Sequence, residues 1–355
     1  MKIALITDTH FGARSDSVPF DMFFEKFYKE TFFPYLDEHG IKTVFHLGDV
    51  FDRRKYVNFS TLKSCRRYFF DKLEERGITT HIIAGNHDTF FKNTNDINSP
   101  DLLLNSYKHI KTYSEATELD FEGTKILAMP WICSGNYEQS LNAMKDTTAD
   151  ICFGHFEIAG FEMHKGQVND HGMDRALFKK FDIVYSGHFH HKSESNNITY
   201  LGNPYEMTWV DFEDPRGFHI FDTETRELTF VKNPFTIFHK LYYDDKDKDI
   251  FWFDGIDVGT FNNAHVKLVV INKTNFHQFD RLVDRIYKAN PLELKIIEDF
   301  SEFESEVLDD ESIDLEDTMT LLSNYVDSVE TEHSKDRIKS MLKTLYLEAQ
   351  SGQND

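Results

Sequence analysis

Cysteine is scarce in this chain, with three residues in 355 and no pair at CxxC spacing. An odd number without paired spacing argues against a disulfide framework and fits free thiols in a reducing compartment. The same scarcity disfavours a structural zinc site, because such sites are built largely from cysteine thiolates.

Long apolar stretches are also missing. No apolar run reaches the length of about 18 residues that a membrane-spanning helix needs. The first residues, Met1–Ile6, carry one lysine and are soon followed by Asp8, which does not fit a secretory signal peptide. We therefore expect a cytoplasmic protein without membrane association.

Positive charge is the third shortage. The formal net charge is −22, and a balance of this sign usually argues against a nucleic-acid partner. The distribution weakens that argument, because residues 298–355 hold 17 acidic and 4 basic residues, a net of −13. The remaining −9 is spread over residues 1–297, where bound divalent metal ions would offset part of it.

Phenylalanine, by contrast, is abundant, with 34 residues, and the chain is long enough for one large aromatic-rich core plus smaller modules. Apolar segments at 2–7, 43–47 and 79–84 have the pattern of strands. Segments with helical spacing, at 19–39 and 58–76, lie between them. Strands that alternate with helices predict parallel pairing.

More strands are predicted further along the chain. They lie at 110–113, 118–121, 125–129, 150–153 and 182–186, and then at 198–201, 217–221 and 228–231, where the pattern favours antiparallel pairing. We interpret the chain as an α/β protein in which two sheets face each other with helices outside.

The character of the sequence changes near Asn233-Pro234. A small β-α-β module is predicted next, then an acidic block with 11 acidic and no basic residues, and then two amphipathic stretches. The predicted divisions are a main domain at 1–235, a capping module at 236–297, a linker at 298–317 and a helical segment at 318–355.

Metal-type ligands follow five predicted strands where each strand ends. In chain order they are Asp8 and His10, Asp49, Asn86 and His87, His155, and His188 and His190. Ligands bind at strand ends in open α/β sheets, and the turning chain there allows neighbouring side chains to converge. Carboxylate, amide oxygen and imidazole together suit Mn²⁺, Fe²⁺ or Zn²⁺ better than Ca²⁺.

Each piece alone has an ordinary explanation. An Asp-x-His sequence is common in polar loops, and Gly, Asn and Asp all favour turns. The chain has 17 histidines, so some pairs arise by chance. Five such pieces, all at strand ends of one chain, favour a shared metal centre over five separate turns.

In this order the pieces resemble the calcineurin-like metallophosphoesterases, over roughly residues 1–235. The motifs stand here as Asp8-Thr9-His10, Gly48-Asp49-Val50-Phe51-Asp52, Gly85-Asn86-His87-Asp88, Gly154-His155 and Gly187-His188-Phe189-His190. The resemblance implies a four-layer α/β/β/α sandwich with a small β-α-β capping domain and a helical C-terminal tail.

Within that superfamily the chain looks most like the Mre11/SbcD nucleases, and more narrowly the recombination exonuclease subunits of T-even phages. The Gly-Asp motif continues as Val-Phe-Asp, as in SbcD-like enzymes, and a capping module, a charged linker and a helical tail follow. The resemblance implies a DNA exonuclease/endonuclease subunit that processes DNA ends in recombination, repair and replication.

The resemblance also assigns roles to residues. It implies two Mn²⁺ ions, with Mg²⁺ or another divalent metal as alternatives. Asp8, His10, Asp49 and His190 would hold one ion, and Asp49, Asn86, His155 and His188 the other, with Asp49 bridging. His87 is then the candidate general acid. Asp52 and Asp88 are candidates for orienting histidines, and His46 and His81 are interpreted as structural.

Partners follow from the same resemblance. DNA, as double-stranded ends and single strands, would be the substrate, and a Rad50/SbcC-like ATPase the partner of a homodimer within a heterotetramer. A phage-encoded chain would act in the cytoplasm of its bacterial host. The apolar stripe of the tail, predicted to bind that partner or else pack on its own domain, consists of Ile338, Met341, Leu342, Leu345 and Tyr346.

Contacts to DNA are predicted for Arg53, Arg54 and Lys55, which directly follow the Gly-Asp motif, and a solvated turn is the alternative. Phe90 and Phe91 either stack on an unpaired base or, more in keeping with their apolar character, pack in a core or a dimer contact.

Two other functions remain open. A phosphatase or cyclic-nucleotide phosphodiesterase would use the same scaffold, and its activity on small phosphoesters rather than DNA would distinguish it. A non-catalytic scaffold is expected to have lost ligands, and here all of them are present.

Overall fold

A computed structural model describes residues 1–164, 166–246, 248, 251–298 and 335. Nearly all of the predicted acidic linker, and the whole apolar stripe from Ile338 to Tyr346, lie outside the described residues. In the described part of the chain, no helix is both long enough and apolar enough to cross a membrane.

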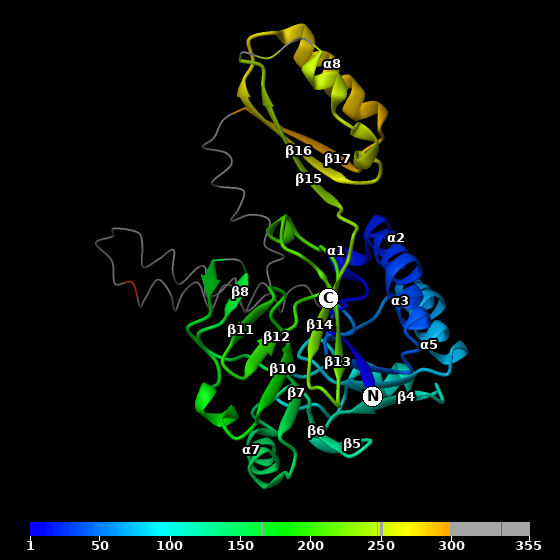
Figure 1. The fold of residues 1–355 in the computed structure, drawn as a ribbon, viewed down its shortest axis with the longest axis vertical. Helices are drawn as coiled ribbons and strands as arrows, with labels where there is room; N and C mark the ends of the chain where they lie inside the picture. The colour runs from blue at the N-terminus through cyan, green and yellow to red at the C-terminus, as the bar shows by residue number, and fades with distance from the viewer. Residues whose placement is uncertain (165, 247, 249–250, 299–334, 336–355) are drawn as a thin grey trace. The chain divides into compact units, whose positions relative to one another are not determined.

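The first large sheet has six strands with β1 inside it. Across the sheet the order is β14 (Leu228–Lys232), β13 (Gly217–Asp222), β1 (Lys2–Ile6), β2 (Thr43–His46), β3 (Thr79–Ile83) and β4 (Ile110–Tyr113). The four strands from β1 to β4 are parallel, as the alternation of strands and helices predicts. β13 joins β1 antiparallel on the other side (Figure 1).

Two long helical segments cover the outer face of this sheet. Each is interrupted by a π-helical turn: α2 (Val18–Phe27), Tyr28–Phe32 and α3 (Phe33–Glu38) form one, and α4 (Phe59–Cys65), Arg66–Phe70 and α5 (Asp71–Glu75) form the other. Their phenylalanines pack with Ala4 and Ile6 of β1 in one buried cluster. The high phenylalanine content therefore fills the layer between helices and sheet. Two short helices, α1 (Ala13–Asp16) and α6 (Ser99–Leu104), lie in the connections.

The second large sheet also has six strands. Its order is β11 (Ser193–Ser195), β12 (Ile198–Tyr200), β10 (Ile183–Gly187), β7 (Ile151–His155), β6 (Thr124–Met129) and β5 (Thr117–Phe121). Helix α7 (Tyr137–Asp146) and the 3₁₀ turn Arg175–Phe178 contribute to the core on its outer face (Figure 1). A hairpin of β8 (Glu162–His164) and β9 (Gln167–Val168) follows β7.

The two large sheets pack against each other. Side chains alternate along β1, so that Ile3 and Leu5 face away from the helices and join a second buried cluster. That cluster also contains Phe153 of β7 and Tyr185 of β10. The layers are therefore helix, sheet, sheet, helix, and the predicted α/β/β/α fold class is confirmed.

A third sheet is formed by residues after Ile237. Its strands β15 (Phe238–Asp244), β16 (His265–Asn272) and β17 (Glu293–Ile297) are all parallel, and α8 (Phe276–Lys288) joins β16 to β17. The side chain of Asn275 caps α8 by accepting from the Gln278 N–H. Two 3₁₀ turns, Trp252–Gly255 and Val258–Phe261, complete the small core.

The start of β15 is packed onto the main core. The Glu206 carboxylate accepts hydrogen bonds from the Thr236 hydroxyl and the N–H groups of Ile237 and Phe238. The described residues up to Glu298 belong to one compact unit. The division of the chain at residue 235 therefore stays a prediction.

The structure corrects three details. β12 pairs antiparallel with β11, as expected for 198–201, but it also pairs parallel with β10, which the sequence pattern does not predict. β15 is not among the strands that the sequence pattern predicts. Phe90 and Phe91 are 39% and 45% exposed, so core packing is wrong for them.

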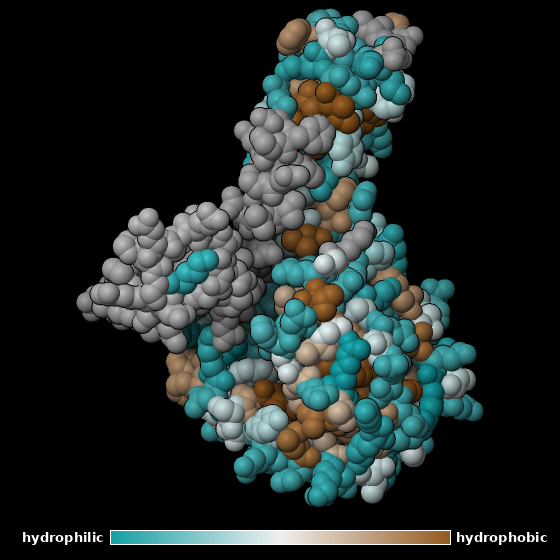
Figure 2. Space-filling model, turned by 90° about the vertical axis from the view of Figure 1, so that its left-hand side faces the viewer, coloured by the Kyte–Doolittle hydropathy of each residue, from teal (hydrophilic) through white to brown (hydrophobic). Residues whose placement is uncertain are grey.

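On the face drawn in Figure 2, hydrophobic residues form small separate patches among hydrophilic ones.

His81 is buried in the central layer as a neutral aromatic ring. It stacks between Phe45 and Tyr113, and its Nδ1 lies 2.8 Å from the Tyr113 hydroxyl. Burial, with a contribution from Lys111, lowers its pKa to about 4 from the ordinary 6.5. Below pH 6.5, His81 binds a proton in the unfolded chain but stays neutral in the folded protein. The free energy of unfolding therefore falls as the pH drops towards 4.

We expect His81→Phe to reduce this acid sensitivity, because a flat ring fits the stack but takes up no proton. Between pH 7 and 4.5 the free energy of unfolding of the parent should fall by about 2 kcal/mol more than that of the variant. Urea unfolding in EDTA at both pH values measures the difference. His39→Phe, at an exposed histidine, is the matched control; equal pH dependence of the parent and the His81 variant would contradict this account.

Candidate metal centre

The backbone at the strand ends is turned into an unusual conformation. Asp8, His10, Asp49 and His188 have φ values of 52°, 41°, 56° and 86°, a region that non-glycine residues rarely adopt. Such strain is concentrated at functional sites and persists only where the surroundings enforce it. Here the loops after β1 and β2 enforce it through backbone bonds from Asp8 N to Gly48 O, at 3.0 Å, and from His10 N to Asp49 O, at 3.1 Å.

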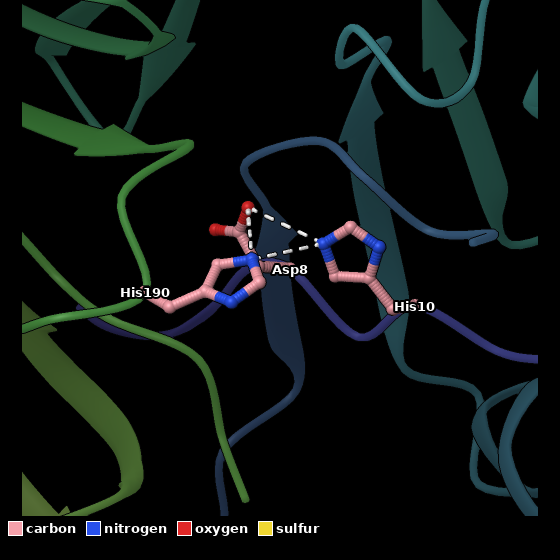
Figure 3. A group of neighbouring side chains, drawn as sticks. All are labelled: Asp8, His10 and His190. Carbon is pink, nitrogen blue, oxygen red and sulfur yellow. Dashed lines mark hydrogen bonds and ion pairs between the residues drawn. The ribbon is translucent and has the colours of Figure 1, made fainter. Parts of the chain in front are cut away.

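Three ligand-type side chains converge at the end of β1. His10 Nε2 and His190 Nε2 lie 3.1 Å apart, and they are 3.9 Å and 4.0 Å from Asp8 Oδ1. Each ring turns its Nε2 toward the Asp8 carboxylate, and the two nitrogens lie next to each other (Figure 3). Together the three atoms could hold one metal ion.

A second group forms beside the first, at the ends of β2, β3, β7 and β10. Asp49, His155 and His188 each offer a ligand atom within 4.8 Å of the others. The Asn86 Oδ1 lies 2.9 Å from both His155 Nε2 and His188 Nδ1. The donor set is therefore one carboxylate, one amide oxygen and two imidazoles, which suits a divalent transition metal.

Asp49 connects the two groups. Its Oδ2 lies 3.3 Å from His155 Nε2 in the second group and 3.7 Å from His10 Nε2 in the first. Its Oδ1 accepts from the backbone N–H of His87 at 2.8 Å. The carboxylate is thus placed where a bridging ligand of two ions would be.

Glycines leave the room for these carboxylates. A Cβ on Gly85 would stand 2.2 Å from Asp49 Oδ1, and a Cβ on Gly187 would stand 2.9 Å from Asp8 Oδ2. Any other residue at either position would push a candidate ligand aside. The two glycines of the Gly-Asn-His-Asp and Gly-His-Phe-His motifs are therefore required by packing around the site.

Neighbouring groups orient the histidines. His155 Nδ1 lies 2.7 Å from the Leu47 carbonyl, which can only accept, so this nitrogen carries a proton and Nε2 faces Asp49. Arg216 donates to the carbonyl of His190 and is itself held by Asp211 and Asp214. Arg216 was missed by sequence reasoning, because only the tertiary fold brings it from the start of β13 to this loop.

Burial and neighbouring charges shift the pKa values of several site residues. Burial raises the pKa of Asp8 to about 6, although His155 opposes the shift. Burial would also lower the pKa of His10 and His155, but nearby carboxylates, Asp49 among them, raise both to about 9. Metal ions need deprotonated ligands, so metal binding displaces protons from these two histidines.

His87 lies next to both groups but belongs to neither. Its ring centre is 4.9 Å from that of His10, and its Nδ1 is 2.7 Å from the carbonyl oxygen of Asp52. The Asp52 carboxylate in turn lies 3.6 Å from His10 Nδ1. Asp52 therefore contacts two histidines, one through its side chain and one through its backbone.

Asp88 has a different role from the one expected. Among the described residues its carboxylate accepts from the N–H groups of Gly85, Val50 and Phe51 and from the Ser99 hydroxyl, and it bonds to no histidine. The expected orientation of a histidine by Asp88 is therefore corrected. Buried carboxylates need several donors, and Asp88 finds them in the backbone of two site loops, which it ties together.

The three basic residues after Asp52 have different surroundings. Arg53 donates from Nη1 to Asp16 at 2.9 Å and to the Tyr56 hydroxyl at 2.7 Å. The guanidinium of Arg54 lies over Trp131, and Lys55 is exposed. DNA contact by these residues stays a prediction, while the tail residues Ile338 to Tyr346 lie outside the described part of the chain.

Asp49→Ala should abolish binding at both metal positions, because it removes an anionic ligand from each and the bridge between them. We expect near-zero occupancy by elemental analysis after reconstitution with Mn²⁺. Asp21→Ala removes a carboxylate bonded to Ser64 and Tyr68 between helices, and it should keep two ions. Two ions bound to the Asp49 variant would rule out the bridging role.

Known proteins are similar to this chain in sequence. The calcineurin-like phosphoesterase family model matches residues 1–192. Exonuclease subunit 1 of Enterobacteria phage T4 is 32% identical over 352 residues, which cover 98% of this chain and 99% of that protein. A subunit of the nuclease SbcCD from Staphylococcus saprophyticus is 22% identical over 215 residues, 51% of this chain and 55% of that protein.

Among solved structures, an archaeal phosphodiesterase aligns with a TM-score of 0.32 and 14% identity over 65% of this chain and 99% of that one, a likeness too weak to support an argument. The match to the family covers more than half of the chain, and the phage relative matches it almost from end to end. The chain therefore belongs to the calcineurin-like phosphoesterases and is a metal-dependent phosphodiesterase.

Proposed function

We propose that this phosphodiesterase is the nuclease subunit of an Mre11-Rad50-like complex and hydrolyses DNA with two Mn²⁺ ions, for which Mg²⁺ or another divalent ion can substitute. The observation that carries the proposal is the pair of ligand groups joined by Asp49 with His87 beside them. The relative from phage T4, named an exonuclease subunit, supports DNA as the substrate.

The residues present fit two ions. Asp8, His10, Asp49 and His190 would hold one, and Asp49, Asn86, His155 and His188 the other. When bound, a pair of divalent ions supplies charge stabilisation for the phosphate and a nucleophile from water near neutral pH. The chain itself positions both groups rigidly, because each ligand lies at or just after the end of a buried strand and Asp88 ties the loops after β2 and β3 together.

His87 would supply the proton to the leaving sugar oxygen. The Asp52 carbonyl accepts from His87 Nδ1, which orients the ring and leaves Nε2 as the atom that exchanges a proton. The backbone N–H of His87 donates to Asp49, so the acid and the proposed bridging ligand are held at a constant separation. An imidazole is well matched to this task near neutral pH.

His87→Asn tests this role, since it keeps polarity and approximate size but cannot deliver the proton. We expect both metal ions and DNA binding to remain while cleavage falls by about 10²–10⁴-fold, the usual contribution of general acid catalysis. His171→Asn, at an exposed histidine, is the matched control. Loss of metal together with activity would make His87 a ligand, and unchanged cleavage would remove it from the mechanism.

The rest of the chain would serve DNA and partner binding. We propose that residues 236–297 form a capping domain that contacts DNA and that 298–317 is a linker. Residues 318–355 would bind a Rad50/SbcC-like ATPase, within a heterotetramer built on a homodimer of this chain in the bacterial cytoplasm. The names of the two relatives, each of which is called a subunit, support assembly with a partner.

A chain that ends at Ile297 should fold and keep Mn²⁺-dependent nuclease activity, because it retains every strand of the described sheets, but it should not co-purify with the co-expressed ATPase. Leu342→Asp in the full-length chain should have the same effect on co-purification, because it places a charge in the apolar stripe. Retained association of both variants would contradict a partner-binding tail.

A phosphatase or cyclic-nucleotide phosphodiesterase on this scaffold is the second candidate. Comparing cleavage of DNA with hydrolysis of a phosphomonoester and a cyclic nucleotide, all with Mn²⁺, separates the possibilities. Activity on the small substrates alone would reject the nuclease.

A further inference from the structure

Arg54 and Trp131 form a cationic and aromatic pair in loops that are bonded to the loop of the proposed acid. Arg54 is in the loop after β2, and Trp131 is in the loop after β6, which belongs to the other large sheet. The guanidinium carbon of Arg54 is 5.1 Å from the centre of the Trp131 ring. Such a contact stabilises one orientation of the planar guanidinium and so fixes the direction in which it presents its N–H groups.

Both members of the pair are anchored next to His87. The backbone N–H of Trp131 donates to the carbonyl of Ala84 at 2.8 Å, directly before the Gly-Asn-His-Asp loop. On the other side, the Asp52 carbonyl that accepts from His87 Nδ1 is only two residues before Arg54. The guanidinium is therefore attached through short, bonded segments to the loop that carries the proposed acid.

Arg54 also has an unmet hydrogen-bonding capacity. Its Nη1 is buried and has no hydrogen-bond partner in the described structure. Buried polar groups are nearly always paired, and an unpaired one calls for a reason. The adjacent Arg53 differs, because its Nη1 is already bonded to Asp16 and Tyr56. The Arg54 Nη1 itself is shielded from solvent, so a phosphate would meet other N–H groups of this half-buried side chain. Of the two arginines, only Arg54 combines a direction fixed by an aromatic ring with an Nη1 that has no acceptor among the described residues.

We propose that Trp131 is a positioning residue that holds Arg54 so that its guanidinium binds a DNA phosphate next to the phosphate being cleaved. Guanidinium groups form strong, directional hydrogen bonds to phosphate oxygens. On a chain with a net charge of −22, a held cation at the site locally offsets the repulsion of a polyanion. This inference rests on the proposed nuclease function and assigns part of its substrate contact.

The test compares two substrates for each variant, a DNA oligonucleotide and bis(p-nitrophenyl) phosphate, which has no neighbouring phosphate. Arg54→Ala should lower kcat/KM for DNA by about 10-fold or more, the effect of losing a charged hydrogen bond. Hydrolysis of the small ester and the metal content should not change. The slope of log kcat/KM for DNA against log salt concentration should become shallower by about one unit, the contribution of one phosphate contact.

Trp131 is tested in the same assay. Trp131→Leu should lower kcat/KM for DNA by about 3-fold to 10-fold, while Trp131→Phe should restore most of it because a ring remains under the guanidinium. The Arg54→Ala and Trp131→Leu double variant should be no worse than Arg54→Ala alone, since both changes remove one interaction. Arg53→Ala removes the same charge from the same loop and should lower kcat/KM for DNA by less than Arg54→Ala does.

Three results would overturn the inference: equal losses for Arg53→Ala and Arg54→Ala, additive effects in the double variant, or a loss on the small ester as large as on DNA. The last result would place Arg54 at the reacting phosphate instead. A parent enzyme that hydrolyses the small ester but does not cleave DNA would reject the nuclease assignment itself, and this inference with it.

Discussion

The site depends on one buried carboxylate. Asp49 lies between the two ligand groups, within 4 Å of a histidine in each, and it also holds the loop of His87 through a backbone bond. Burial alone would raise its pKa, but His155, His87 and His10 lower it well below the ordinary value, so it remains an anion in the interior. A buried anion of this kind is tolerated only where positive charge, from protonated histidines or metal ions, surrounds it.

The fold brings loops from both sheets to that carboxylate. Asp8, Asp49 and Asn86 come from the first sheet, while His155 and His188 come from the second. The packed central layer holds the two sheets together, with Phe45 against Phe153 at 5.2 Å between ring centres. Because these side chains are closely packed, the strand ends keep fixed positions and the ligands need little reorganisation to meet an ion.

Some details of the site follow from tertiary contacts that no local pattern reveals. Asp88 stands in a motif that suggests a partner for a histidine, but its oxygens are taken up by backbone donors of two loops. Arg53 and Arg54 are neighbours in sequence, and only the fold pairs one with Asp16 and places the other on Trp131. Similarly, β12 pairs antiparallel with β11, which directly precedes it, while the pairing with β10 on its other side is parallel and depends on the tertiary fold.

The sequence by itself determined the fold class, most strand positions and the identity of the candidate ligands. These follow from local causes. The spacing of apolar residues sets strands and helices, and the five ligand motifs stand at the ends of five strands. The grouping of the ligands and the bridging place of Asp49 were implied only by the family resemblance, and the tertiary structure supplies the distances behind them. It alone decided which glycines must lack a Cβ and that Asp88 bonds to backbone groups. Those properties depend on distances between residues far apart in the chain, which only the packing of the two sheets sets.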